Sequence, residues 1–183
     1  MFDDSLEPSL SAIGNLVTKK MAAYNIHVDG VTEHGGGFYM YVTSASSLGG
    51  IAAKVPEMMT TVVTYMERNN LPKNGAPFIL YNSIDETNST AIFSAAVATR
   101  DKVVTPNTSS VLCGSLPRQK VVKTTLNGNY KNLEEAWKKT ETYILKNKLE
   151  KNTSGMPMEV FVVSSENTAN PANWVTELYI PIQ

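Results

Sequence analysis

Two stretches with the same order of residue types decide the fold: Tyr65-Met66-Glu67-Arg68-Asn69-Asn70-Leu71 and Tyr143-Ile144-Leu145-Lys146-Asn147-Lys148-Leu149. Downstream of each, Pro77-Phe78-Ile79-Leu80-Tyr81 matches Pro157-Met158-Glu159-Val160-Phe161. Val97-Ala98-Thr99 then matches Ile180-Pro181-Ile182. Each match alone is short, but three matches in the same order indicate an internal duplication.

The elements around these stretches repeat as well. Residues 55–69 carry apolar residues at helical spacing and are preceded by a β-rich run at 38–43. Strands follow at about 77–82 and 90–98. The second copy has a strand at 120–126, a helix at about 130–147 and strands at about 157–163 and 174–181. The sequence therefore predicts an α+β fold of duplicated strand–helix–strand–strand modules, which form a pseudo-two-fold antiparallel sheet with a ligand cleft between the halves.

The start of the chain has a different pattern. Residues 5–24 show helical spacing of apolar side chains, and the run Gly35-Gly36-Gly37 predicts a joint. We therefore expect an N-terminal helix and linker over residues 1–35 and the main domain over residues 36–183.

Composition excludes several classes of function. A net charge of -1 over 183 residues gives no electrostatic basis for direct nucleic-acid binding. One cysteine, Cys113, and two histidines predict no disulfide and no metal site. There is no phosphate-binding glycine loop, and no cofactor is expected. No apolar run is long enough to span a membrane and no signal peptide is evident, so a cytoplasmic protein is expected.

Two carboxylates form the sharpest chemical feature. If 157–163 and 174–181 form an antiparallel hairpin, Glu159 falls opposite Leu178 or Glu177, and the two acids become cross-strand neighbours. The duplicate half has Ile79 and Ser94 at the matching places, so the fold does not require the acids. The alternative is that both acids face water on an open sheet.

Aromatic side chains offer partners for these acids. They would supply flat apolar surface for stacking and cation–π contact, although each one taken singly is more often structural. The candidate ligand-binding residues are Glu159, Glu177, Trp137, Tyr130, Phe161, Tyr179, Tyr41 and Tyr81.

Several motifs resemble those of the GyrI-like family, also called the AraC-type effector-binding domain. They are Asn127-Gly128-Asn129-Tyr130, followed by Leu133 and Trp137, then Pro157-Met158-Glu159-Val160-Phe161, and the terminal stretch 174–182. The resemblance covers roughly residues 36–183. It implies a pocket between the halves that takes bulky, often cationic or aromatic compounds, with acids balancing the ligand charge. A regulatory role follows, in which the domain senses or sequesters a small organic ligand.

The resemblance also implies alternatives. Some stand-alone members resemble hydrolases of strained cyclopropanoid genotoxic compounds, for which Glu159 or Glu177 with Tyr130 or Tyr179 would be an acid–base pair. The family's namesake suggests a gyrase-inhibitor-like interaction module. Residues 1–24 resemble the closing helix of a START-like domain, so a START-like or DNA-binding domain could lie elsewhere. No catalytic residue is assigned.

Overall fold

The computed structural model describes residues 17–19 and 23–183. Of the helix predicted over residues 5–24, residues 17–19 are helical, residues 23 and 24 are not, and the rest lies outside the described residues. The first strand begins at Asn25 and the last ends at Pro181.

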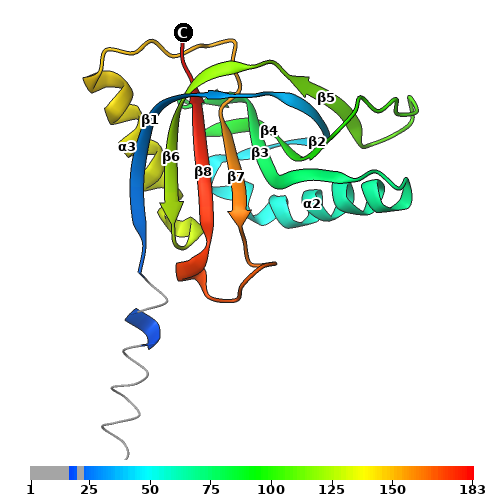
Figure 1. Cartoon of the computed structure of the whole chain (residues 1–183), viewed down its shortest axis with the longest axis horizontal. Coiled ribbons are helices and arrows are strands. Elements are labelled where there is room, and N and C mark those ends of the chain that lie inside the picture. Colours follow the sequence, from blue (N-terminus) through cyan, green and yellow to red (C-terminus); the bar gives the residue numbers. More distant parts are fainter. Residues whose placement is uncertain (1–16, 20–22) are drawn as a thin grey trace, which may run out of the picture.

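The described chain forms one eight-stranded antiparallel sheet with two long helices (Figure 1). The strands are β1 (Asn25–His34), β2 (Gly37–Ser47), β3 (Lys73–Asp85), β4 (Thr90–Thr99), β5 (Leu112–Leu116), β6 (Gln119–Asn127), β7 (Met158–Val163) and β8 (Val175–Pro181). The helices are α2 (Ile51–Arg68) and α3 (Leu133–Lys146), with short 3-10 turns η1 (Leu48–Gly50), η2 (Tyr130–Asn132) and η3 (Pro171–Asn173).

The order of the strands reveals a pseudo-two-fold axis. The sheet runs β1-β6-β8-β7-β3-β4-β2-β5, so the two halves meet where β7 pairs with β3. At that junction Ile79 is the partner of Glu159, flanked symmetrically by Phe78 with Val160 and Leu80 with Met158. The predicted fold class is confirmed, and the axis passes beside the Ile79–Glu159 pair.

The repeated stretches 65–71 and 143–149 end the two helices in the same way. The side-chain amides of Asn69 and Asn147 each donate to a carbonyl one turn back, both at 2.8 Å. The next residues, Asn70 and Lys148, both have φ near 53°. This left-handed residue reverses the chain after the helix, so the repeated sequence encodes a repeated helix stop.

Two edge strands were not predicted. β1 precedes β2 in the chain but pairs with β6, and β5 precedes β6 but pairs with β2. Each repeat is therefore strand–strand–helix–strand–strand, and its leading strand lies in the half of the other repeat. The linker predicted over residues 25–35 is largely strand β1, which joins the sheet ahead of residue 36.

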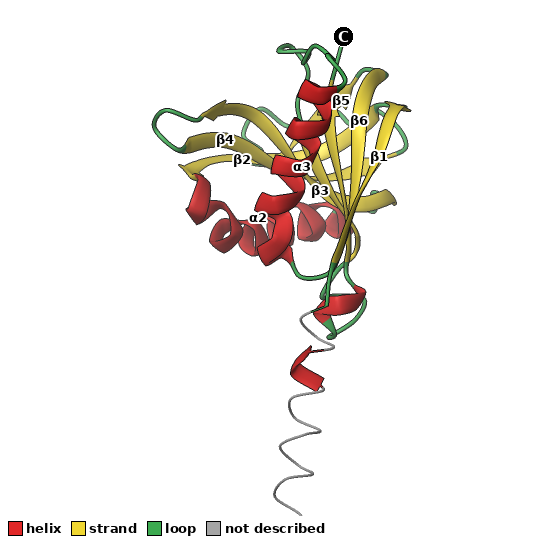
Figure 2. Cartoon of the chain, turned by 90° about the vertical axis from the view of Figure 1, so that its left-hand side faces the viewer, coloured by secondary structure: helices red, strands yellow, loops and turns green. Residues whose placement is uncertain are grey.

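Both helices cover the same face of the sheet (Figure 2). Val62 and Met66 of α2 pack on Met40 and Val97, whereas α3 packs on Val122, Leu178 and Ile180. The other face carries a separate buried cluster: Tyr39, Phe78, Leu80, Ala96, Leu116 and Met158. Side chains alternate along each strand, so neighbouring residues of a strand lie on opposite faces of the sheet.

Candidate functional site

Glu159 lies on the helix-covered face of the sheet, at the junction of the halves. Glu159 is 4% exposed. The indole Nε1 of Trp137 donates to its Oε1 at 2.6 Å, and the hydroxyl of Tyr81 donates to the same oxygen at 3.1 Å. Three elements meet here, because Trp137 comes from α3, Tyr81 from β3 and Glu159 from β7.

Burial governs the electrostatics of this group. Removal from water raises the pKa of Glu159, and the hydrogen bonds from Trp137 and Tyr81 only partly oppose that rise. Burial, followed by the neighbouring Glu159 carboxyl, also raises the pKa of Tyr81 far above its ordinary value. Tyr81 therefore stays protonated and acts as a donor to Glu159.

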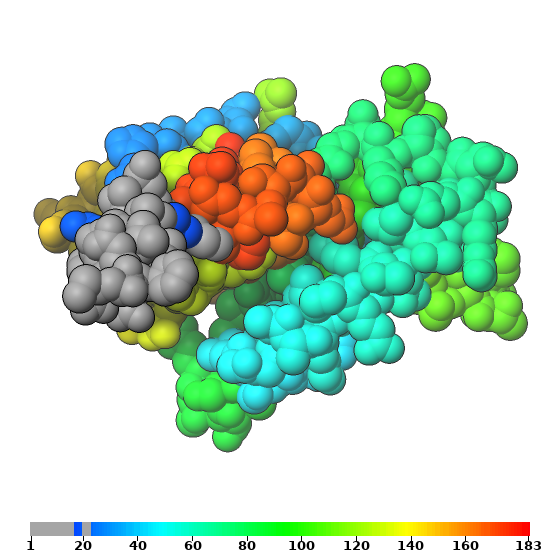
Figure 3. Space-filling view, turned by 90° about the horizontal axis from the view of Figure 1, so that it is seen from below, coloured from blue at the N-terminus to red at the C-terminus, as the bar shows by residue number. Residues whose placement is uncertain are grey.

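Aromatic rings surround the carboxyl group. The rings of Tyr81 and Trp137 meet edge to face at 5.3 Å. Further along the strands, Tyr130 meets Phe161 at 5.3 Å and stacks on Trp174 at 4.5 Å. Seen from the end of the molecule where the β7–β8 hairpin lies, the surface is hollowed between this hairpin and α2 (Figure 3). Trp174 was not among the predicted site residues, although it begins the terminal motif and lies three residues before Glu177.

Glu177 lies on the opposite face of the sheet. The register pairs Glu159 with Leu178 and Val160 with Glu177, so the two acids point to different sides. Glu177 accepts from Lys123 Nζ at 2.7 Å and from the Tyr179 hydroxyl at 2.6 Å. The prediction that the acids are neighbours on one face is therefore wrong, because the pairing differs by one residue.

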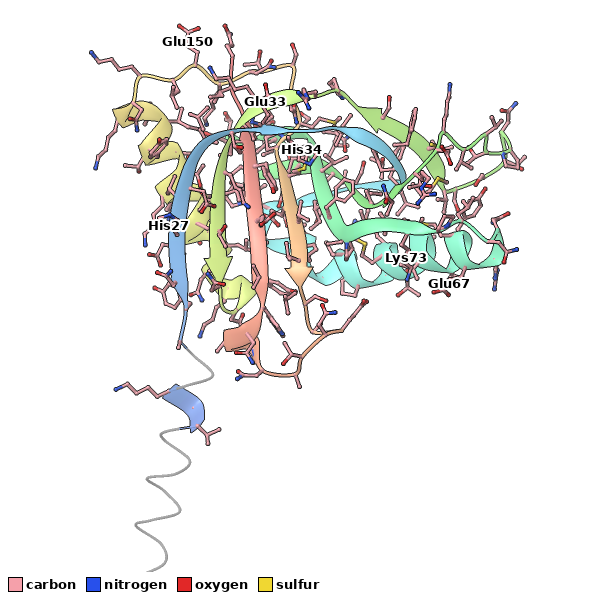
Figure 4. The ribbon with its side chains drawn as sticks, viewed as in Figure 1. His27, Glu33, His34, Glu67, Lys73 and Glu150 are labelled. Atoms are coloured by element: carbon pink, nitrogen blue, oxygen red, sulfur yellow. The ribbon has the colours of Figure 1, made fainter. Side chains whose placement is uncertain are left out.

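The surroundings of Glu177 favour its charged form. Burial alone would raise the pKa of Glu177, but the bonds from Lys123 and Tyr179 outweigh burial and hold the pKa below its ordinary value. The ring of His34 meets Tyr179 edge to face at 5.2 Å, where β1 crosses the ends of β8 and β7 (Figure 4). This carboxylate is already neutralised by a lysine.

The structure thus divides the eight predicted site residues. Five lie together on the helix-covered face: Glu159, Trp137, Tyr81, Tyr130 and Phe161. Three lie on the other face: Glu177, Tyr179 and Tyr41. Two shallow hollows of about 540 Å³ each occur elsewhere, along α2 near residues 103–111, and neither is lined by Glu159.

Within the described residues, no cluster of three or more His, Cys, Asp or Glu side chains is arranged to hold a metal ion. None of the helices in the described ranges has the length and apolar character needed to cross a membrane.

Comparison with solved structures identifies the fold. The crystal structure of the EcmrR C-terminal domain superposes with a TM-score of 0.74 at 15% identity, covering 87% of this chain and 98% of that one. EcmrR in its cryo-EM complex with DNA gives 0.71 at 17% identity, and the match covers 96% of this chain but 65% of the EcmrR chain. SAV2435 bound to tetraphenylphosphonium gives 0.57 at 13% identity, covering 88% and 94%.

A search of curated proteins finds no match. The sequence model of the Cass2 family, described as integron-associated effector binding protein, matches residues 36–182. That range includes both helices, seven of the eight strands and every predicted site residue. The chain therefore belongs to the Cass2 family of effector-binding proteins, as the GyrI-like motifs of its sequence predicted.

Proposed function

We propose that this effector-binding domain takes an organic cation at the Glu159 carboxyl group, between its two halves. The observation that carries the proposal is a glutamate residue 4% exposed, whose carboxyl group accepts from two neutral donors and has no lysine or arginine among its hydrogen-bond partners. Its twin in the other half is Ile79. The fold therefore accepts an apolar residue at that position, which supports a functional rather than a structural role for Glu159.

A bound cation would offset the cost of the buried charge. An ionised carboxylate away from water is strongly disfavoured unless it is paired, and flat aromatic faces add about 0.5–2 kcal/mol each to a cation's binding. The rings of Tyr81, Trp137 and Phe161 stand next to the acid. The neighbour SAV2435, which binds tetraphenylphosphonium, has the same fold.

In the structure Trp137 holds the position that the cation would take. Its Nε1 is 2.6 Å from Glu159 Oε1. A ligand that pairs with this oxygen would have to displace the Trp137 ring, which α3 carries. We therefore propose that binding changes the conformation of α3. Such a change suits a sensing role, whose output would run through another domain or another chain.

The contacts give little support to the hydrolase alternative in its Glu177–Tyr179 form. Of the acid–base pairs considered, Glu177 and Tyr179 are hydrogen bonded at 2.6 Å. The pKa of Glu177 is lowered, whereas burial and the Glu177 bond raise the pKa of Tyr179. Shifts in these directions move both groups away from neutral pH, where a general acid or base works best.

The test compares two ions of matched shape and opposite charge, tetraphenylphosphonium and tetraphenylborate, by isothermal titration calorimetry. Glu159→Gln keeps the size of the side chain and an acceptor for Trp137 and Tyr81. It should weaken the phosphonium by at least about tenfold, or 1.4 kcal/mol, and should not weaken the borate.

The matched control is Glu177→Gln, which removes the same charge from the opposite face. It should leave the phosphonium affinity within about twofold of wild type. If Glu159→Gln weakens both ions equally, or if Glu177→Gln weakens the phosphonium as strongly as Glu159→Gln does, Glu159 is not the cation site.

A further inference from the structure

Thr176 buries a hydroxyl group that has no hydrogen-bond partner. The residue is 0% exposed, and its Oγ1 is one of two buried side-chain polar atoms without a partner in the described part of the chain. The other, Gln119 Nε2, belongs to a residue at the start of β6, next to Gly155. An unpaired buried hydroxyl costs free energy, so native structures rarely keep one without a reason.

Thr176 lies on the same face of the sheet as Glu159. On β7 and β8, Glu159 is opposite Leu178, and Phe161 is opposite Thr176. Thr176 is therefore the diagonal neighbour of Glu159, with Cα atoms about 7–8 Å apart in such an arrangement. Along the strands it lies on the side of Glu159 nearer to Tyr130, whose ring contacts Phe161.

Other threonines on this face are satisfied. The hydroxyl groups of Thr124 and Thr140 bond to each other at 2.7 Å, and Thr140 also donates to the carbonyl of Ala136. Both residues are 0% exposed, like Thr176. The interface between α3 and the sheet can therefore pair its hydroxyl groups, and Thr176 is the exception.

The duplication shows that the fold does not require this hydroxyl. In the first half Tyr81 is opposite Phe93, as Phe161 is opposite Thr176 in the second half. Phe93 is 0% exposed and entirely apolar. The twin position therefore packs well without a polar group, which leaves the hydroxyl of Thr176 with no structural role.

We infer that Thr176 is a second polar contact of the Glu159 site, which selects organic cations that carry a hydrogen-bonding group about one aromatic ring away from the charge. This inference rests on the proposed function. Glu159 meets the charge, the rings meet the apolar body, and Thr176 meets the polar substituent. Purely hydrocarbon cations still bind, but they leave the hydroxyl unpaired.

The experiment uses two cations of equal size in titration calorimetry: (4-hydroxymethylphenyl)triphenylphosphonium and (4-ethylphenyl)triphenylphosphonium. The ratio of their dissociation constants measures the contribution of the ligand's hydroxyl group to binding. Thr176→Val keeps the shape of the side chain and removes its hydroxyl. It should shift the ratio against the hydroxymethyl compound by about threefold to tenfold, as expected for one hydrogen bond. Thr176→Ser should retain most of the wild-type ratio.

The matched control is Thr124→Val, which removes a buried hydroxyl that is already bonded. It should leave the ratio unchanged. If Thr176→Val also leaves the ratio unchanged while Glu159→Gln weakens both cations, the inference fails and the proposed function stands. If neither cation binds the wild-type protein, or if Glu159→Gln weakens neither, both fail together.

Discussion

At the scale of single residues, the unpaired hydroxyl of Thr176 should affect stability as well as binding. Replacing a buried, unsatisfied polar group with an apolar group of the same shape removes its desolvation cost. Thr176→Val should therefore raise the free energy of unfolding by about 1 kcal/mol or more, measured by urea denaturation without ligand. Thr124→Val should lower it, because its bond to Thr140 is lost. Equal destabilisation by both variants would show that Thr176 is hydrogen bonded in the folded protein.

Residue patterns predicted only in part which candidate residues the structure brings together. Glu159, Trp137, Tyr81, Tyr130 and Phe161 meet, because the strand motif and the helix stripe each place their side chains on a known side. The sequence left two possible partners for Glu159, Leu178 and Glu177, and the structure selects Leu178. A one-residue change in pairing moves a whole strand's side chains to the other face, so hairpin length had to be known before the acids could be placed.

At the scale of elements, the exchanged edge strands depend on one glycine. Gly36 turns the chain between β1 and β2 with φ of 71°, and a Cβ there would meet the backbone of Leu116 and Pro117 at the end of β5. Residues with a side chain rarely adopt that φ, and the backbone atoms in the way cannot move aside as a flexible side chain can.

Gly36→Ala should therefore lower the free energy of unfolding by about 1–3 kcal/mol or more. Gly35→Ala is the matched control, since a Cβ on Gly35 meets nothing within 4 Å. Chemical denaturation of the two variants gives the comparison. A loss for Gly35→Ala as large as that for Gly36→Ala would mean that the approach of Gly36 to the backbone at the end of β5 is not the cause of the loss, because Gly→Ala at an unstrained position should if anything stabilise the fold.

The same elements explain why the edge strands escaped prediction. β1 reads Asn-Ile-His-Val-Asp-Gly-Val-Thr-Glu-His, and one of its ten residues, Gly30, is buried. β5 is five residues long and contains Gly114. Strand prediction relies on a buried apolar face, and these edge strands, with one fully buried residue each, give little of that signal. The inner strands and both helices bury regular apolar faces and were predicted.

At the scale of the whole molecule, the two halves share a fold but differ in polarity. Along the face that the helices cover, the apolar residues Val42, Val62, Ile79 and Phe93 of the first half correspond to Thr124, Thr140, Glu159 and Thr176 of the second. The pairs follow from the matched strands and from the repeated helix stretch. The duplicated fold thus places similar backbones in the two halves, and the second half carries the polar side chains on this face, with Tyr81 of the first half donating to Glu159.

The two acids should give the stability of the molecule opposite dependences on pH. Both start from an ordinary pKa of 4.5. Folding raises the pKa of Glu159, so its contribution to stability is fully present below 4.5 and is lost as pH rises through the folded-state value. Folding lowers the pKa of Glu177, so its contribution is present above 4.5 and is lost as pH falls through the folded-state value.

Urea denaturation of wild type, Glu159→Gln and Glu177→Gln across a pH series separates these contributions. Glu159→Gln should flatten the decline on the alkaline side of 4.5, and Glu177→Gln should flatten the decline on the acid side. Tetraphenylphosphonium should restore stability to wild type on the alkaline side, because it pairs with the ionised Glu159. A Glu159→Gln profile that runs parallel to wild type above pH 4.5 would mean that this carboxyl is solvated, and the charge that the cation site requires would carry no folding cost for a ligand to offset.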